Sequence, residues 1–318
     1  MTAAGAAPAL TVVGSTMIDQ ISYLERMPGR GETVLGRRFA QGFGGKGANQ
    51  AVMASHMGAR VAMVNSVGDD AYGTETIANL ERHGVDTTHM RRVPGASGVA
   101  PIWVEPDGSN RIVIVPGANA GLLPAHAAAA IADQPRVDAV IGQFEIDQLV
   151  TAAAFRAARE RGAITILNPA PAAAIDPELL AVSDWIIPNE HELAIIAREL
   201  ALPDDASDAA LLALASRVGT RLVVTLGERG AALVRDDDVV VVPAPAVDVV
   251  DTTGAGDAFV GAFAYALGAG WAELAAVRLA CAIASESVQR PGTQASFPDV
   301  GRCRAVADQV RATGMAGG

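Results

Sequence analysis

The stretch DTTGAGDAFVGAFAYALGA, residues 251–269, places the carboxylate of Asp257 between a Gly-Ala-Gly turn and a run of apolar residues. The run from Ala258 to Ala272 carries no charge, and its small and aromatic residues predict a helix that is buried on most faces. Asp257 is then the N-cap or a first-turn residue of that helix. The flexible glycines ahead of it allow several backbone N–H groups to point into the positive end of the helix dipole, where an anion binds.

Two interpretations of Asp257 follow from this stretch alone. Asp is among the best N-cap residues, and a cap stabilises a helix by roughly 1 kcal/mol. The same carboxylate beside a row of free amides could instead act on a bound anion and its acceptor. The surrounding sequence has to decide between a cap and a catalytic group.

Composition limits the class of protein. The chain has 318 residues, half of them apolar, which is enough for one large α/β domain or two small domains. Its net charge of -11 repels nucleic acid and anionic membranes, so any bound phosphate must be held locally by backbone amides and a few cations. The two cysteines, Cys281 and Cys303, and five scattered histidines indicate neither a disulfide framework nor a structural metal site.

We expect a soluble, cytoplasmic protein. The longest uncharged helical run has about 15 residues, short of the roughly 20 that cross a bilayer. The first basic residue is Arg26, so the beginning of the chain lacks the charged region of a signal peptide.

Apolar β-rich runs alternate with helical stretches along the chain. The runs predict strands at residues 10–15, 59–68, 137–145, 163–171, 184–189 and 221–227. Helical stretches such as GANQAVMASHMG and DQLVTAAAFRAARERG lie between them. This repeated order predicts a mainly parallel sheet with helices on both faces, and ligands of such sheets bind beyond the carboxyl ends of the strands.

Two segments break this rhythm and predict a second, small sheet. Residues 21–43 and 97–118 alternate apolar and polar residues and contain the hairpin loop PDGSN, with no helix of their own. Such a flap of strands can close over a site, and an edge with Ile102 and Trp103 could pair with a second subunit. The alternative is a surface hairpin without a role.

The glycine-rich stretch GFGGKGANQ is not a Walker A loop, because Lys46 is followed by Gly47 and not by Ser or Thr. Its glycines allow the backbone to approach a ligand, while Lys46 and Asn49 offer the donors and acceptors that a polyol requires. The stretch TLGERG, residues 225–230, ends a strand with two glycines, which by itself is a weak signal for a nucleotide contact.

GGKGAN near residue 45 and DTTGAGD near residue 251, with NEHE and TLGERG between them, resemble the signatures of the ribokinase-like sugar kinases, the phosphofructokinase B type family. The resemblance covers essentially the whole chain, from GSTMID to GTQASFP. It implies a three-layer α/β/α fold with a mainly parallel central sheet, as one kinase domain over residues 1–318. It also implies a small β-sheet lid, from segments at approximately 16–43 and 97–118, that commonly forms the interface of a homodimer.

The resemblance implies the catalytic roles. Asp257 resembles the general base that takes the proton from the sugar's primary hydroxyl, and the amides of Gly254, Ala255 and Gly256 resemble the anion hole for the transferred phosphoryl group. A base contributes about 10²- to 10⁴-fold and an oxyanion donor about 3 kcal/mol, so either role outweighs a cap. The residues implied to bind the sugar are Met17, Asp19, Gly45, Lys46, Asn49, Glu145 and Asp257.

The resemblance also implies ATP, Mg²⁺ and K⁺ as cofactors. The residues implied to contact the nucleotide are Asn189, Thr225, Leu226, Gly227, Glu228, Arg229, Gly230 and Gly256. Glu192 completes an Asn-x-x-Glu pattern associated with magnesium bound through water, whereas the alternative is an exposed charge on a helix face. The residues that match the family's monovalent cation site, mostly through backbone carbonyls, are Asp251, Thr253, Ser287, Arg290, Gly292 and Ser296.

The choice of sugar depends on Met17. In the best-known bacterial ribokinase pattern an Asn stands two residues before the aspartate of GS-x-x-x-D, whereas here Met17 precedes Asp19. A thioether is only a weak acceptor, and kinases of 2-deoxyribose have a similar GS-x-M-x-D string. The sequence favours ATP-dependent phosphorylation of D-ribose at O5, with 2-deoxy-D-ribose as the alternative. Another sugar or nucleoside kinase of the family, or a catalytically silent sugar-binding regulator, is less favoured.

Overall fold

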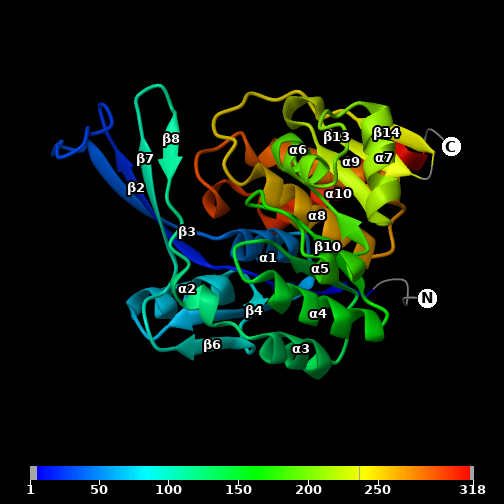
Figure 1. Cartoon of the computed structure of the whole chain (residues 1–318), viewed down its shortest axis with the longest axis horizontal. Coiled ribbons are helices and arrows are strands. Elements are labelled where there is room, and N and C mark those ends of the chain that lie inside the picture. Colours follow the sequence, from blue (N-terminus) through cyan, green and yellow to red (C-terminus); the bar gives the residue numbers. More distant parts are fainter. Residues whose placement is uncertain (1–5, 236, 316–318) are drawn as a thin grey trace.

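A ten-stranded sheet forms the centre of the larger part of the molecule (Figure 1). The computed structural model describes residues 6–235 and 237–315. The strand order is β14-β13-β12-β11-β10-β9-β1-β4-β5, and β6 pairs with β4. The strands are β1 (Ala9–Val13), β4 (Arg60–Gly68), β5 (Val85–Asp86), β6 (Met90–Val93), β9 (Ala139–Gly142), β10 (Ile164–Leu167), β11 (Trp185–Ile186), β12 (Arg221–Thr225), β13 (Ala231–Arg235) and β14 (Asp238–Val242).

The sheet is mainly parallel, as predicted. From β5 and β6 at one end to β12, neighbouring strands pair in parallel. β13 pairs antiparallel with both β12 and β14. The six predicted strands are confirmed as β1, β4, β9, β10, β11 and β12. The sequence interpretation missed β5 and β6, which are short, and β13 and β14, which follow β12 with no α-helix between them.

Helices cover both faces of this sheet. They are α1 (Lys46–His56), α2 (Ala71–Arg82), α3 (Pro124–Asp133), α4 (Gln148–Glu160), α5 (Pro177–Ala181), α6 (Glu190–Glu199), α7 (Asp208–Val218), α8 (Ala255–Gly268), α9 (Glu273–Ser287) and α10 (Val300–Met315). In β1, Leu10 and Val12 pack with α1, α8, α9 and α10, whereas Val13 packs with α3 and α4. On this second face, α6 and α7 cover the other end of the sheet. The predicted three-layer arrangement is therefore confirmed.

The helix that follows the Gly-Ala-Gly turn is buried but shorter than predicted. It ends at Gly268 and not at Ala272, because Gly270 adopts a left-handed φ of 78° and turns the chain into α9. Phe263 of α8 packs edge-on against Trp185 of β11, with ring centroids 5.2 Å apart. Within the described residues, no helix has both the length and the apolar composition to pass through a bilayer.

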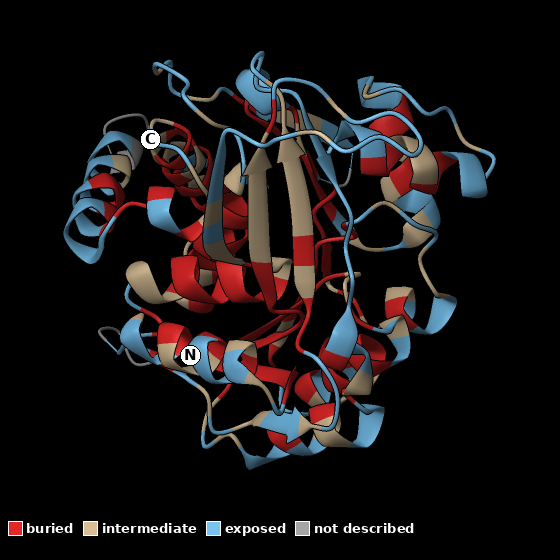
Figure 2. Cartoon of the chain, turned by 90° about the vertical axis from the view of Figure 1, so that its left-hand side faces the viewer, coloured by how far each residue is buried: buried red, intermediate tan, exposed pale blue. Residues whose placement is uncertain are grey.

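Four further strands form the predicted small sheet, which extends away from the three layers (Figure 1). They are β2 (Met17–Tyr23), β3 (Arg38–Gly44), β7 (Val99–Val104) and β8 (Asn110–Ile112), in the order β3-β2-β7-β8. Figure 2 shows these strands in front of the buried layers, with most of their residues only partly buried. The expectation that Ile102 and Trp103 lie on an edge is wrong, because β7 pairs with β2 and with β8.

The division of the chain stays a prediction. The strands of the small sheet fall inside the expected lid segments, approximately 16–43 and 97–118. The loop PDGSN connects β7 to β8, and Gly108 within it has a left-handed φ of 85°. One kinase domain over residues 1–318 and a lid formed by the small sheet remain the predictions.

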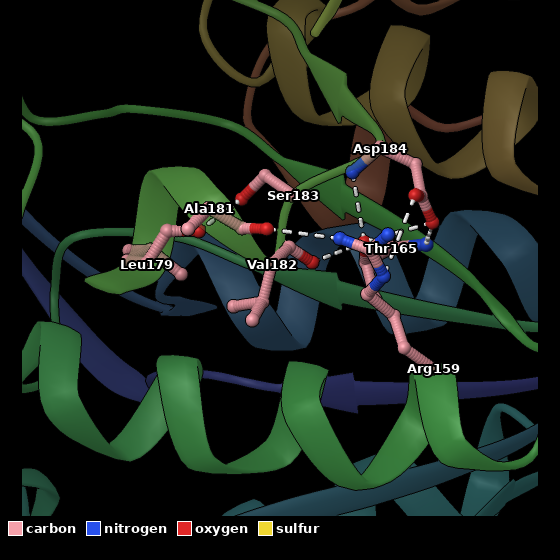
Figure 3. A network of polar contacts seen from close by, with 7 residues as sticks. All are labelled: Arg159, Thr165, Leu179, Ala181, Val182, Ser183 and Asp184. Carbon is pink, nitrogen blue, oxygen red and sulfur yellow. Dashed lines mark hydrogen bonds and ion pairs between the residues drawn. The ribbon is translucent and has the colours of Figure 1, made fainter. Parts of the chain in front are cut away.

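A partly buried polar network joins the amino ends of β10 and β11 (Figure 3). Thr165 Oγ1 donates to Val182 O at 2.7 Å, and the N–H of Asp184 donates to Thr165 Oγ1 at 2.9 Å. Asp184 Oδ2 accepts the N–H of Thr165 at 2.9 Å, and Arg159 of α4 donates to Ala181 O at 2.9 Å. This network satisfies polar groups at the amino ends of the two strands. Ligands of parallel α/β sheets bind at the opposite, carboxyl ends of the strands.

Candidate active site

The side chain of Asp257 lies in the first turn of α8 and is 6% exposed. Its Oδ2 accepts a hydrogen bond from Asn49 Nδ2 at 2.8 Å, and its Oδ1 accepts one from Gln50 Nε2 at 2.9 Å. Because each oxygen has an amide donor, the buried carboxylate is held in one orientation. Asn49, predicted from the resemblance to bind the sugar, therefore lies directly beside Asp257.

Asp257 does not cap its helix. The N-cap of α8 is Gly254, which has a left-handed φ of 80°, and no side chain makes a capping hydrogen bond. A Cβ at Gly254 would lie 2.7 Å from Thr293 Cγ2, so both the φ and the available space require glycine. The capping interpretation of Asp257 is wrong. Of the three predicted anion-hole amides, that of Ala255 already donates to Thr252 O at 3.2 Å.

Three buried amide side chains that the sequence interpretation missed support Asp257. Gln50 Oε1 accepts from Gln143 Nε2 at 2.7 Å, and Gln50 Nε2 also donates to Asn168 Oδ1 at 3.1 Å. Asn168 Nδ2 donates to Ile187 O at 2.9 Å, which turns the oxygen of Asn168 toward Gln50. Their position in the sequence could have identified two of them, because Gln143 and Asn168 directly follow β9 and β10.

Glu145 holds the start of α1. It accepts the backbone N–H of Lys46 at 2.9 Å, and Ser15 Oγ donates to the same oxygen. A carboxylate at this position is stabilised by the helix dipole. Gly45, the N-cap, has a φ of 88°, and a Cβ there would lie 2.8 Å from the backbone nitrogen of Met17. The structure thus brings Gly45, Lys46 and Glu145 together with the start of β2.

A cluster of charges surrounds Lys46. Burial, with the nearby charges of Glu145 and Asp257, raises the pKa of Asp19 to about 7. Burial alone would lower the pKa of Lys46, but Asp257, Glu145 and Glu192 outweigh it and raise that pKa above its ordinary value. One ammonium group therefore faces several carboxylates, and Asp19 is the carboxyl group that takes up a proton near neutral pH.

Met17 is buried at the start of β2, two residues before Asp19 and on the same face of the strand. Asn119 Nδ2 lies 3.7 Å from Met17 Sδ. A Cβ at Gly98 would lie 2.7 Å from that sulfur, so the thioether fills a narrow space. Met17 therefore lies next to the residues predicted to bind the sugar.

The residues predicted to contact a nucleotide lie at the ends of β11 and β12. Asn189 and Thr225 form a bridge between the two strand ends, and the N–H of Thr225 donates to Pro188 O at 3.0 Å. The next residues turn through the 3-10 helix η2 (Gly227–Arg229). Gly230, with a φ of 93°, packs so closely on Val242 that a Cβ would collide with its carbonyl oxygen.

Glu192 is buried, so the interpretation as an exposed charge on a helix face is wrong. It forms a capping box with Asn189 at the start of α6. Glu192 Oε2 accepts the N–H of Asn189 at 2.8 Å, and Asn189 Oδ1 accepts the N–H of Glu192 at 2.9 Å. Burial raises the pKa of Glu192, while the hydrogen bond from Asn189 and the charge of Lys46 oppose this rise.

Two segments, residues 251–253 and 287–296, hold the residues matched to the monovalent cation site, which are Asp251, Thr253, Ser287, Arg290, Gly292 and Ser296. Asp251 Oδ1 accepts the N–H of Thr253 at 2.9 Å, and Asp251 Oδ2 accepts the N–H of Gly292 at 2.8 Å. Ser287 is the last residue of α9, and its hydroxyl donates to Ala284 O at 2.8 Å. Arg290 Nη2 donates to Ser296 O at 3.0 Å, so this carbonyl, expected as a cation ligand, faces a guanidinium.

Phosphoryl transfer to an alcohol requires a place for an anion and a group that accepts a proton. Here the start of α8 is the candidate for the first and the buried carboxylate in its first turn is the candidate for the second. This combination on a mainly parallel α/β/α sheet defines a phosphotransferase with an alcohol group as acceptor. Residues 7–300 match the pfkB family of carbohydrate kinases, and the chain belongs to that family.

Known relatives are similar over nearly the whole chain. The chain is 40% identical over 297 residues to a deoxyribokinase of Salmonella typhi, covering 92% of this chain and 96% of the relative. It is 39% identical over 300 residues to a ribokinase of Mus musculus, covering 92% of each. The structure of an Arabidopsis thaliana ribokinase complexed with ribose and ATP has a TM-score of 0.85 at 30% identity, covering 95% of this chain and 99% of that one. The predicted family and fold class are confirmed.

We predict that Asp19→Asn stabilises the protein increasingly as the pH rises. The pKa of Asp19 in the folded protein, about 7, lies above its ordinary value of 3.8, so folding favours the protonated carboxyl. Ionisation therefore destabilises the folded protein progressively between about pH 4 and pH 7, by at most about 4 kcal/mol. Urea unfolding should show a small increase in the free energy of unfolding for the variant near pH 4 and the full increase near pH 8.

The matched control for this prediction is Asp133→Asn, at the exposed end of α3. Its effect on the free energy of unfolding should be the same at both pH values. A gain for Asp19→Asn that is equally large near pH 4 and pH 8 contradicts the prediction.

Proposed function

We propose that the protein transfers the γ-phosphate of ATP to the primary O5 hydroxyl of D-ribose, giving D-ribose 5-phosphate and ADP. The observation that carries the proposal is the buried carboxylate of Asp257 at the start of α8, held by two amides. The family supports phosphoryl transfer to a carbohydrate. The relatives named ribokinase and deoxyribokinase support a pentose.

Asp257 acts as the general base in this proposal. As O5 attacks the γ-phosphorus, its proton passes to a carboxylate oxygen of Asp257, and the bond from the γ-phosphorus to the bridging oxygen of ATP breaks. The hydrogen bonds from Asn49 and Gln50 fix the carboxylate and leave it lone pairs for that proton. The amides of Gly254 and Gly256 at the start of α8 receive the charge that develops on the transferred group, and the amide of Ala255 joins them when its hydrogen bond to Thr252 O opens.

The sugar binds among residues that supply both kinds of hydrogen-bonding group. The ammonium of Lys46 donates, the carboxylates of Asp19 and Glu145 accept, and a sugar hydroxyl can do both. Gly45 allows the backbone between β3 and α1 to approach the sugar because it carries no Cβ. Asn49 then contacts the sugar and Asp257 at once.

The nucleotide lies along the strand ends, against Asn189 and the segment 225–230, with Gly256 near the transferred phosphate. Glu192 fits a magnesium ion that keeps its water shell, because its buried carboxylate retains lone pairs beyond the capping bonds to Asn189. Bound there, magnesium would neutralise negative charge on the phosphates.

We also propose a homodimer, in the cytoplasm, that forms through the small sheet. Large apolar side chains on and beside that sheet are exposed, among them Phe39 at 62% and Ile112 at 49%. A surface of this kind on an isolated chain indicates a protein interface. Sedimentation of the full chain, compared with Phe39→Asp, distinguishes a dimer from a monomer.

Asp257→Asn should lower the turnover number by about 100-fold or more, because an amide cannot accept the proton of the attacking hydroxyl. Nucleotide binding should change little, since Asn189 and residues 225–230 are untouched. Steady-state rates with ribose and MgATP, nucleotide titrations and thermal unfolding test this together. Asp133→Asn, on the exposed end of α3, is the control. Unchanged turnover in a folded Asp257→Asn protein removes Asp257 as the base.

The alternative substrate is 2-deoxy-D-ribose, and Met17 is the observation that favours it. The two sugars differ only at the 2-hydroxyl, and a buried thioether offers that group little. Met17→Asn should therefore raise kcat/KM for ribose relative to deoxyribose by about tenfold, the effect of one added hydrogen bond. Met17→Leu, which adds no polar group, should leave the ratio near that of the original chain. An equal ratio in all three proteins means that Met17 does not face the 2-position.

We propose that potassium orders the loop before α8. Asp251 already links Thr253 to Gly292, and so holds together the two segments whose carbonyl groups match the family's cation ligands. Because the loop sets the amides at the start of α8, the rate in potassium should exceed the rate in tetramethylammonium several-fold at equal ionic strength. Equal rates in the two salts would falsify the proposal that potassium orders this loop.

A further inference from the structure

A chain of oriented hydrogen bonds runs from the surface of α2 to the proposed base. Arg82 Nη2 donates to Asn79 Oδ1 at 3.2 Å, and Asn79 Nδ2 donates to Gln294 Oε1 at 2.8 Å. Gln294 Nε2 donates to Asn49 Oδ1 at 3.0 Å, and Asn49 Nδ2 donates to Asp257 Oδ2 at 2.8 Å. We call this series the amide relay. It joins α2, the 3-10 helix η3 (Gln294–Ser296), α1 and α8.

The two ends of the amide relay fix its direction. A guanidinium has only donors, and an ionised carboxylate has only acceptors. Turning any amide between them by half a turn would bring two oxygens or two N–H groups together. Asn79, Gln294 and Asn49 are 6%, 7% and 5% exposed, so water has little access to replace a lost partner.

We propose that Gln294 is a positioning residue, which orients the side chain of Asn49 and through it the carboxylate of Asp257. The inference rests on the proposed function, which assigns Asn49 to the sugar and Asp257 to the proton. Gln294 occupies the oxygen of Asn49, and Asp257 occupies one of its two N–H groups. Asn49 therefore offers its second N–H to the substrate and acts as a donor to a sugar hydroxyl.

The turn that carries Gln294 also reaches the anion-binding end of α8. The preceding residue, Thr293, contacts Gly254, where a Cβ would lie 2.7 Å from Thr293 Cγ2. Ser296 donates its N–H to Thr293 O at 3.1 Å, which closes the turn. One short segment thus supports the proposed base through Gln294 and the N-cap of α8 through Thr293.

Gln294→Glu tests the amide relay, because a carboxylate of nearly the same shape accepts from Asn79 but cannot donate to Asn49. At about pH 8 the variant should lose about 100-fold in kcat/KM for the sugar, with a raised KM, because the amide of Asn49 turns toward the new carboxylate. The ratio to the original chain should recover as the pH falls and the new carboxyl group protonates, since a protonated carboxyl donates again.

Gln294→Met and Gln309→Glu are the matched variants. Gln294→Met keeps the length of the side chain without its hydrogen bonds, so its kcat/KM for the sugar should fall about tenfold at every pH. Gln309→Glu makes the same charge change at an exposed position of α10 and should stay within about twofold of the original chain. Equal losses in Gln294→Glu and Gln294→Met at every pH, or no loss in either, overturn the proposal.

A second measurement needs neither substrate nor activity. Asn79 and Asn49 share no hydrogen bond, so without the amide relay the effects of Asn79→Ala and Asn49→Ala on the urea midpoint should add. The relay predicts that the double variant shifts the midpoint by less than the sum, and additive shifts contradict it. If the original chain phosphorylates neither ribose nor deoxyribose, the proposed function fails. The comparison of the two single variants with the double variant still tests the amide relay in that case.

Discussion

Two consecutive residues of α1, Asn49 and Gln50, hold both oxygens of the carboxylate at the start of α8. A buried negative charge is costly unless hydrogen bonds compensate it, so the elements that supply these bonds must keep their relative positions. Gln143 after β9 and Asn168 after β10 hold Gln50 in turn. The position of Asp257 is therefore tied to two helices and to the carboxyl ends of two central strands.

The helix beginnings around this charge require close approach of the backbone. Gly45 at the start of α1 lies against the first residues of β2, and Gly254 at the start of α8 lies against Thr293. Side chains at either place would separate the segments. The small sheet takes part in the same arrangement, because Asp19 of β2 lies near enough to Glu145 and Asp257 for their charges to raise its pKa. In the proposed function, substrate choice and phosphoryl transfer would therefore both depend on how the small sheet sits against the larger one.

The amide side chains show why sequence reasoning found only part of the site. Asn49 and Asp257 lie in local patterns, a glycine-rich turn followed by a helix, and such patterns are visible in a few neighbouring residues. Gln294 and Asn79 lie in stretches without such a pattern, and their hydrogen bonds join residues 215 and 245 positions apart. For Glu192 the capping pattern was present, but its burial depends on how α6 packs against the sheet.

The sequence by itself determined the α/β class, six parallel strands and the small sheet, because periodicity and turn residues act over short distances along the chain. It also determined the kinase family, through the resemblance of its glycine-rich motifs to those of known kinases. Only the tertiary structure decided that β13 and β14 extend the sheet as an antiparallel pair and that α8 ends at Gly268. It also decided which amides face Asp257. A hydrogen bond depends on distance and direction in space, and no local period of the sequence carries that information.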